Sequence, residues 1–454
     1  MANNTEIKTV TQYLDQDYRE YAVYVVEERA IPSVIDGFKP TQRKVIFVAD
    51  RVWRNGSEKP LKIFQLAGKV AAEAHYHHGD GSLNGAIIGM AQKFKNSMPV
   101  LEEIGQFGSL RSPEAGAPRY ISTKLHKNFR LLYMDFDLLT SRYEEGNEIE
   151  PQFFLPIIPT VLLNGGSGIA VGFATNILNR NPLDLIDACI KELDGKKYSE
   201  PAPWYYGFSG SCIQDPENHL AWVFRGKYEI KNTSTIDISE LPPSATYEKF
   251  DLLLSTLEDT RRLASYDNNC RSNINYVLKF RREDLKLLID SNRLDRTLKM
   301  EERQSENFTV LDENGNLKIF NSVTEIIQYF VKFRLAYYIK RKEFLINRLT
   351  HEMMVLTNKA EFIKAIISGK LKINNVPKKE IILFLQVATF EEINGSYSYL
   401  LAMPIHTLTK ETYEDLLGDC FAKEKELEEI KKREHTQMYR DDLQELRKAL
   451  VKTY

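Results

Sequence analysis

Cysteine is scarce in this sequence, and long apolar runs are missing. The four cysteines, Cys189, Cys212, Cys270 and Cys420, lie far apart in the 454 residues, and no Cys-x-x-Cys pair occurs. This spacing argues against structural zinc or a disulfide framework and favours an intracellular protein. No run of about 18 apolar residues occurs, so a membrane span is not expected. The polar N-terminus, residues 1–20, does not resemble a signal peptide.

A phosphate-binding loop and a strong net charge are also missing. No Gly-x-x-x-x-Gly-Lys sequence occurs, which excludes a Walker A nucleotide site. The net charge of −2 argues against a uniformly basic nucleic-acid protein. The charge is unevenly distributed, however. Residues 1–130 contain 18 basic and 14 acidic residues, whereas residues 131–160 contain one arginine and six acids, so any DNA-binding surface must be local.

The first third of the chain, residues 1–150, predicts short helices separated by turns rich in glycine and proline. Apolar residues recur at helical spacing at 14–25, at 45–49 after Pro40, and at 83–94 after a His-Gly-Asp-Gly turn. Three short helices with a tight turn suit a helix-turn-helix or winged-helix domain. On pattern alone, an ordinary small helical bundle is the more common interpretation.

The middle third, residues 151–322, indicates mixed α/β structure. The apolar stretch 156–173, punctuated by glycine and proline, is typical of buried irregular strand, and the alternation over 228–241 predicts a strand. The apolar runs 308–311 and 317–320 flank Asn314-Gly315, which is a strong hairpin signal.

The last third, residues 323–454, predicts long helices. No proline or glycine occurs from 324 to 368, and apolar residues form a seam over 345–367. A small helical knob is expected at about 370–408, followed by a second long helix that starts after Thr409 and runs to the end. This arrangement predicts an antiparallel coiled-coil arm that positions or joins subunits; the alternative is a helical hairpin packed on its own chain.

Three histidines within four positions, His75, His77 and His78, invite comparison with a metal site. No cysteine or carboxylate follows them at metal-ligand spacing, so zinc is disfavoured. Imidazoles beside a glycine turn before a helix also suit contact with phosphate. Asp135 and Asp137 resemble a magnesium-binding carboxylate pair, but the acids that follow favour a solvated acidic loop. No metal site is therefore predicted in this chain.

The dipeptide Arg119-Tyr120 is the strongest candidate for covalent chemistry. A tyrosine hydroxyl has a pKa of about 10, so little phenolate exists near neutral pH. An adjacent arginine can stabilise the phenolate and the negative charge that develops when a tyrosine attacks a phosphodiester. By itself this dipeptide carries little information, because the chain contains 23 tyrosines.

Seven segments in a fixed order carry a resemblance that covers nearly the whole chain. They are RAIPSVIDGFKPTQRKVIF (29–47), LAGKVAAEAHYHHGDGSL (66–83), IGQFGSLRSPEAGAPRYIS (104–122), FFLPIIPTVLLNGGSGIAVGF (153–173), PWYYGFSG (203–210), FRLAYYIKRKEFL (333–345) and YSYLLAMPIHTLTKE (397–411). Together they resemble the DNA breakage-reunion core of type II DNA topoisomerases. The sequences of the motifs are more similar to those of the eukaryotic enzymes than to those of bacterial gyrase. Because the chain starts just ahead of the winged-helix region and shows no ATPase or Toprim domain, it most resembles the medium subunit of the T4-type bacteriophage enzymes.

The resemblance implies an α+β multidomain fold. Residues 1–150 would form a winged-helix (helix-turn-helix) DNA-cleavage domain, and residues 151–322 a mixed α/β tower domain. Residues 323–454 would form a long antiparallel coiled-coil arm, with a small helical exit-gate knob for dimerisation at about 370–408.

The resemblance also assigns roles to individual residues. Tyr120 would attack the scissile phosphate and form a 5′-phosphotyrosyl link, and Arg119 would stabilise the transition state. The residues expected to contact DNA are Arg29, Lys39, Arg43, His77, His78 and Ile169. Of these, Ile169 would be the wedge that kinks the duplex. Ala170 replaces the glycine that usually follows it, and the alternative for Ile169 is a buried strand position.

The implied activity is that of an ATP-dependent type II topoisomerase subunit, which cuts both strands of double-stranded DNA transiently, passes another duplex through and reseals the break. The implied partners are a second copy of this chain and a large subunit that binds ATP and, through Toprim acids, most of the Mg2+. If the chain is phage-encoded, the expected compartment is the cytoplasm of the infected bacterium. Two alternatives remain: a non-catalytic winged-helix DNA-binding scaffold, and a gyrase-type subunit, which would need a basic C-terminal wrapping domain.

Overall fold

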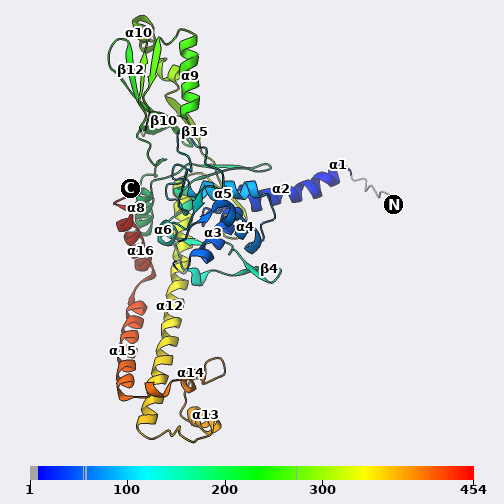
Figure 1. Ribbon diagram of the computed structural model, residues 1–454, viewed down its shortest axis with the longest axis vertical. Helices are drawn as coiled ribbons and strands as arrows, with labels where there is room; N and C mark the ends of the chain where they lie inside the picture. The colour runs from blue at the N-terminus through cyan, green and yellow to red at the C-terminus, as the bar shows by residue number, and fades with distance from the viewer. Residues whose placement is uncertain (1–8, 55, 57–58, 272) are drawn as a thin grey trace. The chain divides into compact units, whose positions relative to one another are not determined.

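The computed structural model describes residues 9–54, 56, 59–271 and 273–454 (Figure 1). The first eight residues of the polar N-terminal segment lie outside this description. The chain forms two compact units. The first runs to Arg334 and includes Asp442–Tyr454, and the second comprises Leu335–Asp441. Among the described residues, no helix is both long and apolar enough to cross a membrane.

The first unit begins with an almost continuous helical segment. It comprises α1 (Val10–Gln12), η1 (Tyr13–Tyr18), α2 (Arg19–Val25) and η2 (Val26–Ala30). The predicted helix at 14–25 is therefore confirmed, but most of its apolar stripe is exposed, including Leu14, Tyr18 and Tyr21. Only the end of the segment, from Val25 onward, packs into a core, together with Leu311.

Three further helices follow, and each buries one apolar face. They are α3 (Pro40–Trp53), α4 (Ile63–Glu73) and α5 (Asp80–Ala91). Pro40 stands in the first turn of α3, where a missing amide hydrogen costs nothing. The predicted helices at Pro40 and at 83–94 are confirmed, although Phe94 lies beyond the end of α5. Between α3 and α4 lies β1 (Leu61–Lys62), which pairs antiparallel with β2 (Ser122–Thr123). After β2 comes α6 (Lys127–Leu132).

Residues 133–177 form short antiparallel ribbons. They are β3 (Tyr133–Met134) with β6 (Leu155–Pro156), β4 (Arg142–Glu144) with β5 (Asn147–Ile149), and β7 (Gly166–Ile169) with β8 (Ala174–Ile177). Between them lie η3 (Phe136–Leu138) and α7 (Thr160–Leu163). The expected buried irregular strand at 156–173 is thus only partly correct, because this stretch contains a short helix and half of an exposed hairpin.

The prediction that Asp135 lies in a solvated acidic loop is wrong. The side chain of Asp135 is almost buried and forms an ion pair of 2.5 Å with the fully buried Arg334. The guanidinium of Arg334 also donates to the carbonyl oxygen of Pro156. A buried carboxylate needs such a partner, and this one comes from a helix about 200 positions away, which local sequence cannot indicate.

Residues 178–320 contain α8 (Pro182–Leu193), two antiparallel sheets and a hairpin. The three-stranded sheet has the order β15-β10-β9, from Glu301–Ser305, Ala221–Arg225 and Ser211–Gln214. The four-stranded sheet has the order β11-β12-β14-β13, from Lys227–Ile230, Thr235–Glu240, Tyr276–Lys279 and Ser265–Asn268. Its apolar face packs against α9 (Tyr247–Asp259), α10 (Arg282–Asp290) and α11 (Leu294–Leu298) (Figure 1).

Two sequence predictions fall in this region, one wrong and one confirmed. The prediction of a single strand over 228–241 is wrong, because the chain turns between β11 and β12. The side chain of Asn232 accepts a hydrogen bond from the amide of Ser234 and so stabilises the turn. The predicted hairpin around Asn314-Gly315 is confirmed as β16 (Phe308–Leu311) and β17 (Leu317–Phe320).

The long helices are α12 (Val323–Ile367), α15 (Lys410–Lys432) and α16 (His435–Leu450), and the smaller elements between them are α13 (Lys378–Val387), α14 (Ser398–Leu401) and η4 (Ile405–Thr407). The long helix predicted from 324 and the N-cap at Thr409 are confirmed. The second long helix is not continuous, since Arg433 adopts an extended conformation between α15 and α16.

Within the second unit, α12 and α15 run antiparallel. The ammonium of Lys342 donates to the carbonyl of Lys431 at 2.9 Å, and Glu352 pairs with Lys423 at 2.9 Å. The partner's residue number falls as the residue number in α12 rises, as antiparallel packing requires. Of the predicted seam, Leu349, Ala360 and Ile363 are buried.

Candidate active site

Tyr120 lies on an exposed turn that is fixed at both sides. The pairing of β1 with β2 places the segment after the tyrosine against the start of α4. The ammonium of Lys62 donates to the carbonyl of Tyr120 at 2.8 Å, and the amide of Tyr120 donates to the carbonyl of Ala117 at 2.9 Å. The side chain remains accessible, with Tyr120 73% exposed. This geometry holds the backbone and leaves the hydroxyl able to reach a large substrate.

Arg119 lies next to this ring. Its guanidinium carbon is 6.0 Å from the centre of the Tyr120 ring, within the range of a cation–π contact. Both residues are exposed, so a substrate could engage the guanidinium and the hydroxyl together. Sequence reasoning did not single out Lys62, because its contact with Tyr120 joins residues 58 positions apart and leaves no local signal.

A groove on the first unit brings together three of the predicted DNA contacts. The cavity, of about 540 Å³, is lined by Arg29 from η2, Lys39 at the start of α3 and His78 in the turn before α5. Gly166 and Ser167 of β7 also line the cavity. The cavity is also lined by one carboxylate, that of Glu28, but two basic side chains and an imidazole outnumber it and suit an anionic ligand. Within the described ranges, neither Tyr120 nor Arg119 lines this groove.

The three side chains of the groove that could contact an anion are held in different ways. The Lys39 ammonium donates to the carbonyl of Ser167 at 2.7 Å, and burial lowers the pKa of Lys39 below its usual value. The His78 ring lies 2.8 Å from the hydroxyl of Tyr24, a contact that sequence reasoning did not anticipate. Arg29 is exposed at the end of η2.

Ile169 ends β7 and projects into solvent. It is 88% exposed, which rules out the alternative of a buried strand residue. The hairpin that carries it is seated closely on η2, because a Cβ atom at Gly168 would lie only 2.0 Å from the carbonyl oxygen of Ala30. Glycine is therefore required at this position, and it fixes the place from which Ile169 projects.

Arg43 does not reach the surface, contrary to the expected phosphate contact. Its side chain is 8% exposed and forms an ion pair of 2.7 Å with the fully buried Asp36. A second nitrogen donates to the other carboxylate oxygen of Asp36 and to the carbonyl of Phe38. The guanidinium thus neutralises a buried charge, and its donors point inward.

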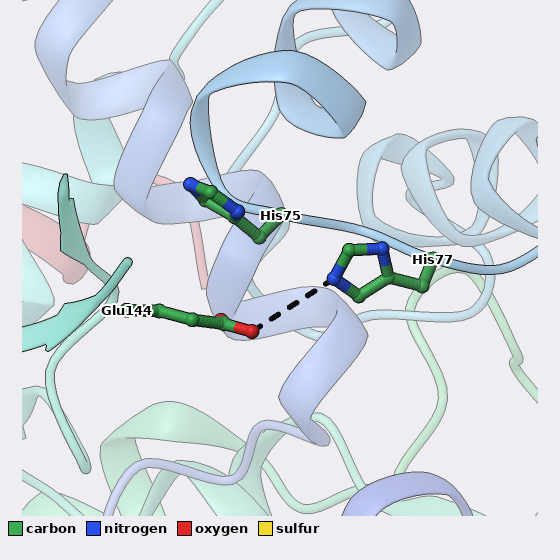
Figure 2. A group of neighbouring side chains, drawn as sticks. All are labelled: His75, His77 and Glu144. Carbon is green, nitrogen blue, oxygen red and sulfur yellow. Dashed lines mark ion pairs between the residues drawn. The ribbon is translucent and has the colours of Figure 1, made fainter. Parts of the chain in front are cut away.

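His77 is exposed, as a DNA contact requires, but it lies outside the groove. Its ring nitrogen is 3.8 Å from a carboxylate oxygen of Glu144. His75 lies beside them, and the potential ligand atoms of the three residues lie within 4.8 Å of one another (Figure 2). None of these three residues is a sequence neighbour of Tyr120.

Comparison with known proteins gives a consistent match over the whole chain. The family model for the A-type subunits of DNA gyrase and topoisomerase IV matches residues 29–444. The chain is 33% identical over 453 residues to the DNA topoisomerase medium subunit of Enterobacteria phage T4, and this alignment covers 98% of this chain and 99% of the phage protein. It is 32% identical over 467 residues to the mitochondrial DNA topoisomerase 2 of Dictyostelium discoideum, covering 98% of this chain and 36% of that protein.

A solved structure agrees with these sequence matches. The fold superposes on the DNA-binding, cleavage and re-ligation domain of Plasmodium falciparum topoisomerase II with a TM-score of 0.85 and 31% sequence identity. The match covers 96% of this chain and 63% of the other. The chain spans about a third of the length of the topoisomerase 2 relatives that it matches.

Proposed function

This chain belongs to the family formed by the A-type subunits of DNA gyrase and topoisomerase IV. It is a breakage-reunion subunit of the type II topoisomerase kind, and from that premise we propose how it acts on DNA. Tyr120 is the nucleophile. Its phenolic oxygen attacks the scissile phosphorus and loses its proton, while the bond from phosphorus to the 3′ oxygen breaks and that oxygen takes up a proton. The 5′ phosphate remains on Tyr120, so the reverse attack by the 3′-hydroxyl reseals the strand without external energy.

Arg119 stabilises the charge that develops in this step. The position of the guanidinium beside the Tyr120 ring supports this role, because a cation there can interact with the phenolate and with the equatorial oxygens of the phosphorus centre. The observation that carries the assignment is the exposed Tyr120 on a turn whose backbone is held by Lys62. Tyr143 is exposed as well, so exposure makes the Tyr120 hydroxyl accessible and the adjacent Arg119 distinguishes it.

The groove formed by Arg29, Lys39 and His78 binds the phosphates of the duplex to be cut. Such contacts fix the position of DNA without reading its sequence, and they make affinity depend on salt. Ile169 acts as the wedge, because an exposed apolar side chain on a seated hairpin can enter between two base pairs and kink the duplex. His77, which is exposed outside the groove, also contacts DNA backbone.

The wider architecture follows the family pattern. Residues 1–150 act as the winged-helix cleavage domain and 151–322 as the tower. Residues 323–454 form the coiled-coil arm, with an exit-gate knob at about 370–408 that joins two copies of this chain. Two copies are needed because two strands are cut and each requires one Tyr120. A large partner subunit supplies ATP hydrolysis and the Toprim acids that hold Mg2+, and the complex works in the cytoplasm of an infected bacterium.

The test is a cleavage reaction stopped with denaturant. The purified chain is mixed with its large partner subunit, Mg2+ and supercoiled plasmid, and covalent protein–DNA adducts are measured. Tyr120→Phe should abolish the adduct and leave DNA binding nearly intact, because only the hydroxyl is lost. Tyr143→Phe is the matched control, since Tyr143 is 68% exposed and should leave adduct formation unchanged.

The rival function is a non-catalytic DNA-binding scaffold. It predicts DNA binding without any covalent adduct in the wild-type chain. An adduct that persists in Tyr120→Phe would instead show that another residue is the nucleophile.

A further inference from the structure

Two histidines before α5 and one glutamate of β4 converge on a common space. Figure 2 shows the His75 and His77 rings and the Glu144 carboxylate facing one another, and their candidate ligand atoms lie within 4.8 Å of one another. In a tetrahedral site with bonds of about 2.0–2.2 Å, ligand atoms lie about 3.4 Å apart. The present separations therefore need only small side-chain rotations to close around an ion.

The chain directs both imidazoles to the same side. His75 has a φ of 48°, a left-handed conformation that non-glycine residues rarely adopt. The next residue, Tyr76, is 9% exposed and turns inward. His75 and His77 flank this buried ring, His77 is exposed and His75 is partly exposed, so the turn leaves both imidazoles accessible.

The carboxylate comes from a hairpin that is fixed on the same unit. Glu144 is the last residue of β4, paired with Asn147 of β5. Glu148 of β5 forms an ion pair of 2.5 Å with Arg51 of α3 and accepts a hydrogen bond from Ser141. These contacts fix the hairpin on α3, and the side-chain nitrogen of Asn147 lies 3.4 Å from Nε2 of His75, so Glu144 is placed beside the turn before α5 without any metal.

We propose that His75, His77 and Glu144 form a binding site for a divalent transition-metal ion, best suited to Zn2+, which ties the β4–β5 hairpin to the turn before α5. Two imidazole nitrogens and one carboxylate oxygen match the ligands that zinc accepts, with a fourth position left for water. Mg2+ is a poor occupant, because it prefers oxygen ligands in octahedral geometry. This site is therefore separate from any magnesium used in DNA cleavage, and the proposal does not depend on the proposed function.

Zinc binding to the full chain tests this proposal. The chain is freed of metal with a chelator and titrated with Zn2+ against a chromophoric indicator, in buffer containing excess Mg2+. We expect one tight site per chain. His75→Ala, His77→Ala and Glu144→Gln should each weaken binding at least about tenfold, as losses of metal ligands do.

Two other histidines serve as controls. His219→Ala removes an exposed histidine elsewhere, and His78→Ala removes the neighbour whose ring already contacts Tyr24. Both should change Zn2+ affinity less than about twofold, because neither supplies a ligand. Equal losses in His219→Ala and in Glu144→Gln would show general surface binding and overturn the proposal.

Two measurements on the wild-type chain remain decisive even if the variants fold poorly. Zn2+ should slow amide hydrogen exchange in residues 142–149, because the ion joins this hairpin to a second segment. Co2+ should give the intense visible absorption of a four-coordinate site. Unchanged exchange, or only the weak absorption of six-coordinate Co2+, would refute the site.

Discussion

Replacing Arg43 by methionine separates a structural role from contact with DNA. The arginine makes three hydrogen bonds: to the two carboxylate oxygens of Asp36, at 2.7 and 3.0 Å, and to the carbonyl of Phe38, at 3.1 Å. Methionine keeps the apolar stem and removes all three donors. The fully buried carboxylate of Asp36 then retains the backbone amides of Phe38 and Phe154, both at 3.0 Å.

The cost of this change follows from leaving a buried charge without its counter-ion. Removing one partner of a buried ion pair typically costs about 3–5 kcal/mol. Because two amides continue to solvate Asp36, we expect the low end, about 3 kcal/mol in the free energy of unfolding of the first unit. Denaturant titration followed by the fluorescence of Trp53, which lies in the same helix as Arg43, would measure it.

An exposed ion pair provides the control. Lys69 and Glu73 lie 3.5 Å apart on the surface of α4, and Lys69→Met should cost less than about 1 kcal/mol. If Arg43 instead contacts DNA, Arg43→Met would leave stability near that of the wild type and reduce the salt slope of DNA binding by about 1. That combination would refute the structural role.

Three other predictions address the hairpin of Ile169 and one histidine. Gly168→Ala should displace β7 from Ala30 and reduce DNA bending, measured by fluorescence energy transfer between duplex ends, whereas Gly68→Ala, which meets nothing within 4 Å, should not. Ile169→Gly should lower the bend angle more than the affinity, because unstacking a base step costs a few kcal/mol that the wedge must offset; an unchanged angle would contradict the wedge. Burial lowers the pKa of His126, whose ring caps α6 by accepting from an amide. The unfolded chain therefore binds the proton first, so this stability is present above pH about 6.5 and is lost below it. His126→Asn should flatten the fall in melting temperature on acidification, and an equally steep fall in the variant would argue against it.

The elements predicted correctly from the sequence are those whose signals lie in their own residues or in the adjacent turn. The 45 residues of α12 carry no glycine or proline, and Asn314-Gly315 marks the five-residue turn between β16 and β17, where Gly315 has a φ of 84°. The break at Arg433 was missed because no glycine or proline marks it. The turn at Asn232 did have a signal, since Asn-Thr-Ser commonly forms side-chain-stabilised turns, but the alternating pattern on both sides obscured it.

Candidate site residues could be predicted from the sequence where they form a recognisable motif. They could not be predicted where their role depends on whether the side chain is buried. Arg119-Tyr120 stands out in its sequence context, and the structure leaves both residues exposed. Arg43 was misassigned because its partner Asp36 lies across the turn at Gly37, and sequence spacing does not indicate that both are buried. Glu144 was missed as a companion of His77 for the same reason, since the fold alone brings the hairpin to the turn.

The groove and the exposed wedge are parts of one structural arrangement. The ammonium of Lys39 donates to Ser167 in β7, and the close approach of Gly168 to Ala30 seats the same strand on the helix end that carries Arg29. A DNA phosphate that attracts Lys39 competes with the carbonyl of Ser167, and a charged acceptor forms the stronger hydrogen bond. On the proposed function, phosphate binding in the groove would therefore act directly on the strand that ends in Ile169. On the proposed function, this coupling would let a chain with a net charge of −2 act on DNA, because a few well-placed cations are linked to the side chain that would deform the duplex.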